Sequence, residues 1–154
     1  MEAYFLDSSA IVKRYVSEKG TVWVSDLFDS AAGNIIYAVR LAGVEVVAAI
    51  ARRRRGKSLS SKDAADSIQQ FNLEFGSNYV ILEVTTTLVD RAMNLADSYA
   101  LRGYDAIQLA SALETNDIRL VAQAPPLILV CADLELNAAA IAEGLAVENP
   151  DIYP

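Results

Sequence analysis

Short apolar runs alternate with longer segments of helical spacing along the whole chain. Four apolar runs have the length and composition of buried strands, and they occupy residues 3–6, 34–39, 79–84 and 127–130. A short segment at residues 146–149 could add a fifth strand at the sheet edge. Because the runs read as continuously apolar, they predict a mainly parallel sheet that is covered on both faces.

The segments between these runs carry apolar residues at helical spacing and predict helices. The predicted helices occupy residues 8–18, 21–31, 41–55, 61–76, 86–99, 104–114 and 133–142. Gly56 is a C-terminal stop for one helix, and Ser60 with Asp63 has capping-box spacing at the start of the next. Strands and helices in this order predict an α/β fold with four to five strands.

Length and composition favour one packed domain over residues 1–154. Hydrophobic residues make up 53% and charged residues 21% of the chain, which is typical of a globular protein. The N-terminus lacks the basic start and apolar stretch of a secretory signal, and no later run is long and apolar enough to span a membrane. We therefore expect a soluble, cytoplasmic protein with no membrane partner. Cys131, the single cysteine, excludes an internal disulfide.

The absence of histidine narrows the possible chemistry more than any other feature of the composition. It excludes Ser-His-Asp and Cys-His nucleophiles, histidine zinc sites and acid–base catalysis by histidine. If the protein is an enzyme, carboxylates must carry its chemistry. Because Asp and Glu oxygens are hard ligands, the ion that they would gather is Mg²⁺ or Mn²⁺.

Charge is unevenly distributed along the chain, whose net charge is −7. Residues 1–60 contain 9 Lys/Arg and 6 Asp/Glu, a net of +3, whereas residues 61–154 contain 4 and 14, a net of −10. Much of the positive charge is in one run, which consists of Arg52, Arg53, Arg54, Arg55 and Lys57. The run could contact phosphates, or it could be a solvated helix end whose cations suit the C-terminal dipole.

Two predicted strands lead directly into an aspartate. Asp7 follows the first strand at once, and Asp133 follows the fourth after Cys131 and Ala132. Residues just past the carboxyl ends of parallel strands line the crevice in which ligands bind. Each aspartate could alternatively serve only as a helix cap. The presence of both favours a site at this edge of the sheet.

Two further acids are isolated within apolar helices. Glu45 lies inside LAGVEVVAAIA, where an ionised carboxylate is costly unless it is paired or bound to a cation. Alternatively, Glu45 could have a structural role and form a salt bridge to Arg40 or Arg52. Asp105 lies near the start of the helix DAIQLASAL. Alternatively, its charge could serve only to stabilise the N-terminus of that helix, as a cap or through the helix dipole.

The four carboxylates make chemical sense together as a metal site. Clustered carboxylates repel one another and raise one another's pKa, unless a divalent ion restores the ionised forms. The chemistry available to such a cluster is attack of an activated water on a phosphodiester, with the ion neutralising charge on the phosphate.

Four segments, taken in order, resemble the PIN-domain nucleases and, within them, the VapC-type ribonuclease toxins of bacterial toxin–antitoxin pairs. The segments span nearly the whole chain, and they read LDSSAIVKRY, GVEVVAAIARRRRGKSLS, LRGYDAIQLASAL and VCADLELNAAAIAEGLAVENP. By this resemblance Asp7, Glu45, Asp105 and Asp133 match the acidic positions of the family, and Ser9 matches a small polar position that supports the first aspartate.

The resemblance also implies the fold, the activity and the partners. We expect a three-layer α/β/α fold, Mg²⁺- or Mn²⁺-dependent cleavage of RNA, homodimers, and inhibition by a small antitoxin. Cys131 departs from the family, which usually has Ser or Thr at this position, and we expect a small buried thiol without a catalytic role. Asn137 could help to bind metal or substrate, or it could be an amide on the helix surface.

Other α/β classes fit the sequence less well. Receiver domains need an early acidic pair and a late lysine, and the phosphatases need Asp-x-Asp, but Asp7 is followed by Ser8 and Ser9, and no lysine follows Lys62. The seven glycines never cluster into a phosphate-binding loop. The remaining rival is a non-catalytic PIN-fold module that binds RNA or protein.

Overall fold

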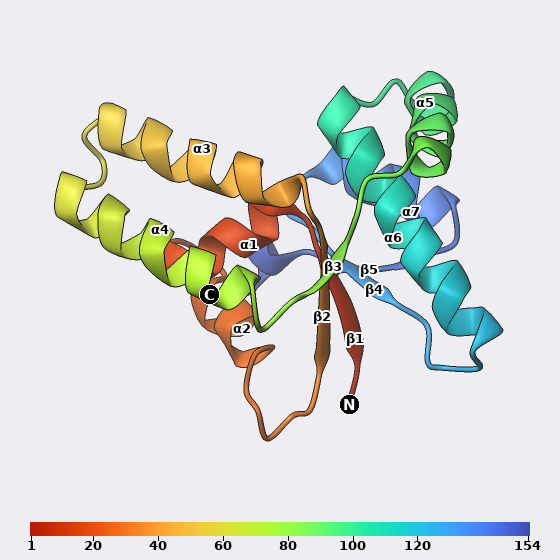
Figure 1. Cartoon of the computed structure of the whole chain (residues 1–154), viewed down its shortest axis with the longest axis horizontal. Helices are drawn as coiled ribbons and strands as arrows, with labels where there is room; N and C mark the ends of the chain where they lie inside the picture. Colours follow the sequence, from red (N-terminus) through yellow and green to blue (C-terminus); the bar gives the residue numbers. More distant parts are fainter.

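The computed structural model describes the whole chain, residues 1–154, and contains a five-stranded sheet in the order β3-β2-β1-β4-β5 (Figure 1). All four neighbouring pairs of strands are parallel, which confirms the predicted sheet. The strands are β1 (Ala3–Leu6), β2 (Ile35–Val39), β3 (Val80–Leu82), β4 (Ile128–Val130) and β5 (Ala146–Glu148). The fifth strand lies at the edge, as predicted.

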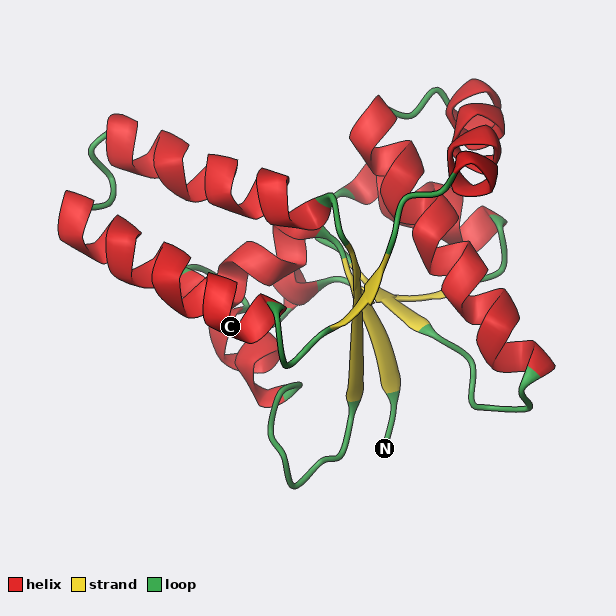
Figure 2. Cartoon of the chain, in the orientation of Figure 1, coloured by secondary structure: helices red, strands yellow, loops and turns green.

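Helices cover both faces of the sheet, so the fold is the expected three-layer α/β/α arrangement (Figure 2). The helices α1 to α4 lie on one face, and α5 to α7 lie on the other (Figure 1). Their bounds are α1 (Ser8–Tyr15), α2 (Thr21–Asp26), α3 (Ala42–Arg55), α4 (Ser61–Phe75), α5 (Thr86–Tyr99), α6 (Gly103–Val121) and α7 (Leu134–Ala142). A short 3-10 helix, η1 (Pro150–Ile152), follows β5 and packs on α2.

The core forms where the apolar strands meet the inward faces of the helices. Phe5 and Leu6 of β1 and Leu129 and Val130 of β4 are fully buried, because these central strands have helices on both sides. Burial of such side chains contributes about 1.5–3 kcal/mol each. The strands β1 and β4 are therefore firmly held, and the site begins at their carboxyl ends.

Hydrogen bonds extend the parallel ladders beyond the strands. The backbone N–H of Asp7 donates to the carbonyl of Val130 at 3.2 Å, and that of Cys131 donates to Glu148 at 3.1 Å. Because the strands are parallel, the residues that follow β1 and β4 emerge side by side at one edge of the sheet.

Two helices differ by five or more residues from the predicted lengths, and α1 ends three residues earlier than predicted. α2 ends at Asp26 and not near residue 31, because Asp29 accepts a hydrogen bond from the N–H of Ala31 at 2.9 Å and the chain turns there. α6 continues to Val121, beyond the predicted end at residue 114, because no helix breaker occurs before Pro125. None of the helices combines the length and the hydropathy that a membrane crossing requires.

Candidate active site

Asp7 lies between β1 and α1 and is almost completely buried, with 3% of its surface exposed. Its Oδ1 accepts the backbone N–H of Ala10 at 3.0 Å and the hydroxyl of Ser9 at 2.6 Å. Its Oδ2 accepts the thiol of Cys131 at 3.1 Å. Asp7 therefore caps α1, and it does so within a network of donors that fixes both of its oxygens.

Burial raises the pKa of Asp7 to about 6, and the negative charge of Glu45 adds to the rise. The hydrogen bonds from Ser9, Cys131 and Ala10 oppose the effect of burial. A buried carboxylate in this state carries its charge at a cost and gains from a nearby cation.

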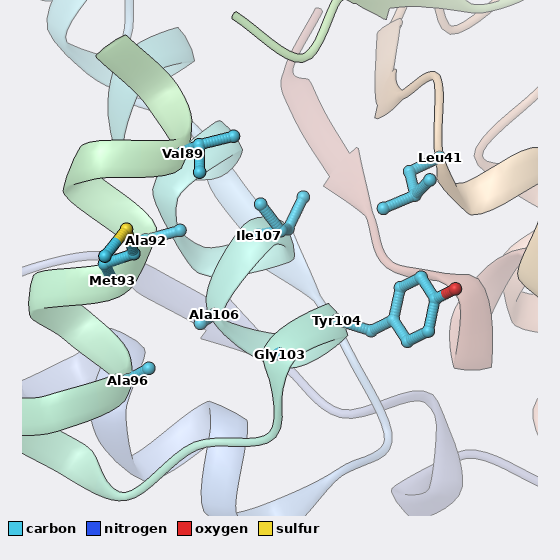
Figure 3. Close-up of a pocket in the computed structure, with 9 residues that line it drawn as sticks. All are labelled: Leu41, Val89, Ala92, Met93, Ala96, Gly103, Tyr104, Ala106 and Ile107. Carbon is cyan, nitrogen blue, oxygen red and sulfur yellow. The ribbon is translucent and has the colours of Figure 1, made fainter. Parts of the chain in front are cut away.

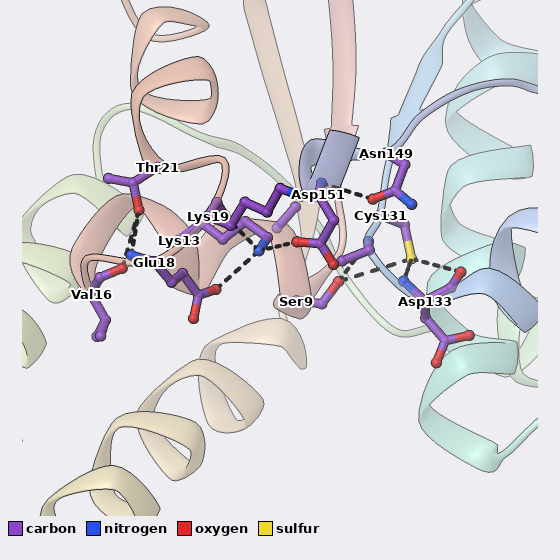
Figure 4. A network of polar contacts seen from close by, with 12 residues as sticks. Ser9, Lys13, Val16, Glu18, Lys19, Thr21, Cys131, Asp133, Asn149 and Asp151 are labelled. Atoms are coloured by element: carbon purple, nitrogen blue, oxygen red, sulfur yellow. Dashed lines mark hydrogen bonds and ion pairs between the residues drawn. The ribbon is translucent and has the colours of Figure 1, made fainter. Parts of the chain in front are cut away.

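Ser9 and Cys131 link the carboxyl ends of β1 and β4 through hydrogen bonds (Figure 4). The N–H of Ala132 donates to Ser9 Oγ at 3.0 Å, and the N–H of Asp133 donates to Cys131 Sγ at 3.2 Å. Burial, followed by the charge of Asp7, raises the pKa of the Cys131 thiol well above its usual range. The thiol is buried, as predicted, and as a protonated donor it supports Asp7 as well as the backbone of Asp133.

Glu45 projects from the first turns of α3 and is held by two neutral donors. Ser8 donates to Oε2 at 3.0 Å, and the side-chain amide of Gln108 donates to Oε1 at 3.1 Å. The alternative of a salt bridge is wrong, because Arg40 pairs with Glu83 and no ion pair joins Glu45 to Arg52. The carboxylate of Glu45 thus has two neutral hydrogen-bond donors and no cationic partner in the chain.

Asp105 and Asp133 lie at the N-terminal ends of α6 and α7. Burial raises the pKa of Asp105, and the charges of Asp133 and Glu45 raise it further. Asp133 caps α7 by accepting the N–H of Leu136 at 2.9 Å, so capping occurs here as well. Glu45 therefore lies close enough to act on both Asp7 and Asp105, and Asp133 lies close enough to act on Asp105.

The side chains around these acids fit a hard cation. No group of three acidic or thiol side chains is arranged so that it could hold an ion jointly in this conformation. Two buried amide oxygens, Gln108 Oε1 and Asn137 Oδ1, nevertheless have no hydrogen-bond partner. Both amides are joined to the site, Gln108 through Glu45 and Asn137 through the carbonyl of Cys131 at 2.8 Å. Carboxylate and amide oxygens are ligands that Mg²⁺ and Mn²⁺ prefer.

Asn137 is not a helix-surface amide, and that interpretation of the sequence is wrong. It is 7% exposed and lies on the buried side of α7 with Leu136 and Ala140. Asn137 lies one helical turn after Asp133, so its side chain faces the end of β4. There its amide donates a hydrogen bond to the carbonyl of Cys131.

The arginine run fills the last turn of α3, but its members point in different directions. Arg53 pairs with Glu18 at 2.5 Å, whereas Arg54 lines a groove against α4. Arg52 lines a pocket of about 490 Å³ that also contains Glu45. A helix that turns 100° per residue separates four consecutive side chains in this way.

Glu18 connects the arginine run to the C-terminal segment through a buried cation (Figure 4). Lys13 is 5% exposed, and its ammonium contacts Glu18 at 3.2 Å and Asp151 at 2.6 Å. The pairing of Arg53 is therefore part of the packing of α1, α3 and η1.

Three neighbours of the acids were not singled out from the sequence. Ser8 and Gln108 hold Glu45, and Tyr104 lines the same pocket as Glu45. Gln108 could have been recognised, because it is the one amide inside the apolar run DAIQLASAL. Ser8 and Tyr104 carried no signal beyond their position next to a predicted acid.

The sequence and the fold assign the chain to a family. It belongs to the PIN-domain family, whose signature matches residues 4–143. Ribonuclease VapC45 of Mycobacterium tuberculosis (strain CDC 1551 / Oshkosh) is 33% identical over 154 residues, which covers 100% of both proteins.

Two solved structures share the fold. PAE2754 from Pyrobaculum aerophilum superposes with a TM-score of 0.63 at 20% identity, covering 98% of this chain and 85% of that one. A toxin–antitoxin complex from Klebsiella pneumoniae contains a chain with a TM-score of 0.58 at 15% identity, covering 96% of this chain and 97% of that one.

Proposed function

We propose that the chain is an endoribonuclease that hydrolyses RNA phosphodiester bonds with Mg²⁺ or Mn²⁺, and that it is the toxin of a toxin–antitoxin pair in the cytoplasm. The observation that carries the proposal is the burial of Asp7, which is 3% exposed at the carboxyl edge of the sheet, with the charge of Glu45 close enough to act on it. Carboxylates that raise one another's pKa are stabilised by a divalent cation. The likeness to Ribonuclease VapC45 supports RNA as the substrate.

Each acid has a separate role in the proposed reaction. Asp7, Asp105 and Asp133 would hold one or two ions. Ser9 donates to Asp7, and Asn137 holds the carbonyl of Cys131, two residues before Asp133. When bound, the ion supplies positive charge that stabilises the phosphate in the transition state. Glu45, which Ser8 and Gln108 orient, would complete the site or accept a hydrogen bond from the attacking water.

The proposed partners are an RNA substrate, a cognate antitoxin and a second copy of the chain. The antitoxin is supported by the fold shared with a chain of the Klebsiella pneumoniae toxin–antitoxin complex. The homodimer follows from the family resemblance. Sedimentation of the purified chain, alone and with the product of any short reading frame beside its gene, would test both partners.

The test of the activity is an incubation with mixed RNA, including transfer RNAs. The purified chain, freed of any bound partner, is expected to cleave RNA with Mg²⁺ or Mn²⁺ and to lose this activity with a chelator. A folded, partner-free protein that binds the ion but leaves every RNA in the pool intact would instead favour the non-catalytic binding module.

Gln108→Leu is expected to lower the rate of cleavage by about tenfold while the fold remains intact. Leu fills most of the same volume but cannot donate to Glu45, which would then be held by Ser8 alone. Loss of a group that orients a site residue typically costs about 10–100-fold in activity. Single-turnover cleavage measures the effect, and an unchanged rate would show that the orientation of Glu45 does not matter.

A further inference from the structure

A pocket beside the acids has the chemistry of a nucleotide subsite. It has a volume of about 490 Å³ and lies between α1 and α3, with Tyr104 of α6 also lining it. Val12 of α1 and Val44 and Ala48 of α3 give it an apolar wall, and Ser8 and Glu45 bring it to the proposed active site. It thus offers apolar surface directly beside the place of the reaction.

One face of α3 carries the two charged groups of this pocket. Glu45, Ala48 and Arg52 recur at helical spacing, so the two charged residues lie two turns apart, roughly 10 Å along the axis. Arg52 is exposed and makes no ion pair within the chain, whereas its neighbour Arg53 is bound to Glu18. Arg52 is therefore the arginine of the run that is both free and directed to the site.

Tyr104 supplies an aromatic ring whose polar end is also free. The residue is 50% exposed, immediately precedes Asp105, and its hydroxyl has no hydrogen-bond partner in the chain. Figure 3 shows the ring extending away from α6 in the direction of Leu41, at the edge of an apolar groove that Tyr104 shares with α5. A ring in this position can receive a planar group on its exposed face.

The charge of the surrounding elements suits a polyanion. Both walls of the pocket come from residues 1–60, which carry a net charge of +3 in a chain whose net charge is −7. A strand of RNA that reaches the four acids therefore meets the positive charge of Arg52 at this pocket.

We propose that the pocket binds the nucleotide next to the scissile bond of single-stranded RNA, with the base stacked on Tyr104 and a backbone phosphate bound by Arg52. Aromatic rings stack on any base, and arginine binds phosphate through paired donors. The proposal rests on the proposed ribonuclease function, because it states where the RNA strand binds when the four acids cleave it. It makes Tyr104 and Arg52 substrate-binding residues, and it assigns no such role to Arg53.

The binding test uses a fluorescein-labelled single-stranded RNA of random sequence, with a chelator present so that cleavage does not interfere. Tyr104→Ala is expected to raise the Kd by about tenfold, while Tyr104→Phe keeps the ring and binds as the wild type does. Arg52→Gln is expected to weaken binding and to lower the slope of log Kd against log salt by about one. Arg91→Gln removes the same charge on α5, where Arg91 pairs with Asp117, and is expected to change neither quantity.

The cleavage assay with Mg²⁺ separates this proposal from the proposed function. Tyr104→Ala and Arg52→Gln should raise KM more than they lower kcat, because both residues contact RNA away from the reacting atoms. If the variants weaken RNA binding but no metal supports cleavage, the subsite stands and the nuclease does not. If cleavage needs the metal and Asp7 while the Kd and KM of both variants equal those of the wild type, or if the wild type binds no RNA, the subsite is wrong.

Discussion

Asp7→Asn is expected to reduce metal-dependent cleavage of RNA by at least about a thousandfold while it stabilises the metal-free protein. The loss of activity follows because a neutral amide holds a divalent cation poorly. The gain in stability follows because Asp7 is buried and burial raises its pKa to about 6, so its charge is costly at neutral pH. Asn has nearly the same shape, and the expected gain is about 1–3 kcal/mol at pH 7–8.

The gain should depend on pH in a definite direction. The unfolded chain has an aspartate pKa near 4, whereas the folded chain has a pKa of about 6 at Asp7. Between these values the folded state binds more protons, so the contribution of Asp7 is full below pH 4 and is lost as the pH rises through 6. The stability of the wild type relative to Asp7→Asn should therefore fall from pH 4.5 to pH 7 and then level off.

Urea unfolding of both proteins in chelator, across this range of pH, measures the difference. Asp90→Asn is the matched control, because Asp90 is exposed on α5, and it should keep both the activity and the stability of the wild type. Equal stability of wild type and Asp7→Asn at every pH would contradict the account of the buried charge. Mg²⁺ should stabilise the wild type more than Asp7→Asn, since by the proposed function the ion would bind the folded state through that carboxylate.

Gly20→Ala is expected to lower the free energy of unfolding by about 2–4 kcal/mol. Gly20 precedes α2 with φ +85°, a left-handed conformation that side chains adopt at a cost. A Cβ at this position would lie 2.4 Å from the carbonyl oxygen of Pro150, so either α2 or η1 must shift. The contacted atom belongs to the backbone and not to the end of a flexible side chain, so the contact cannot be relieved without moving a helix.

Gly144→Ala is the control that separates conformational strain from the close contact. Gly144 has φ +92°, but a Cβ there would meet nothing within 4 Å. Gly144→Ala should lower the free energy of unfolding by only about 1–2 kcal/mol, the cost of a left-handed conformation for a residue with a Cβ. Urea unfolding of the two variants gives the comparison. If both lose the same stability, the contact with Pro150 does not constrain the fold.

The site was predictable to the extent that it depends on where strands end. Asp7 and Asp133 could be placed because the short apolar runs AYFL and LILV predict buried strands, and parallel strands bring their carboxyl ends to one edge. Glu45 could be singled out as a candidate site residue because an isolated acid in an apolar helix needs a partner or a bound cation. Its actual partners, Ser8 and Gln108, lie 37 and 63 residues away in sequence, and no local pattern indicates such contacts.

The amino-acid sequence by itself determined the order of strands and helices and the parallel sheet, because these follow from hydrophobic periodicity. It also predicted the four acids of the candidate site, from strand ends and from charges isolated among apolar residues. Only the tertiary structure decided that Asn137 is buried, that the Cys131 thiol binds Asp7, and that Arg52 and Arg53 have different surroundings. The reason is physical. Periodicity depends on neighbours along the chain, whereas burial, hydrogen bonding and pKa depend on groups that packing brings from distant segments.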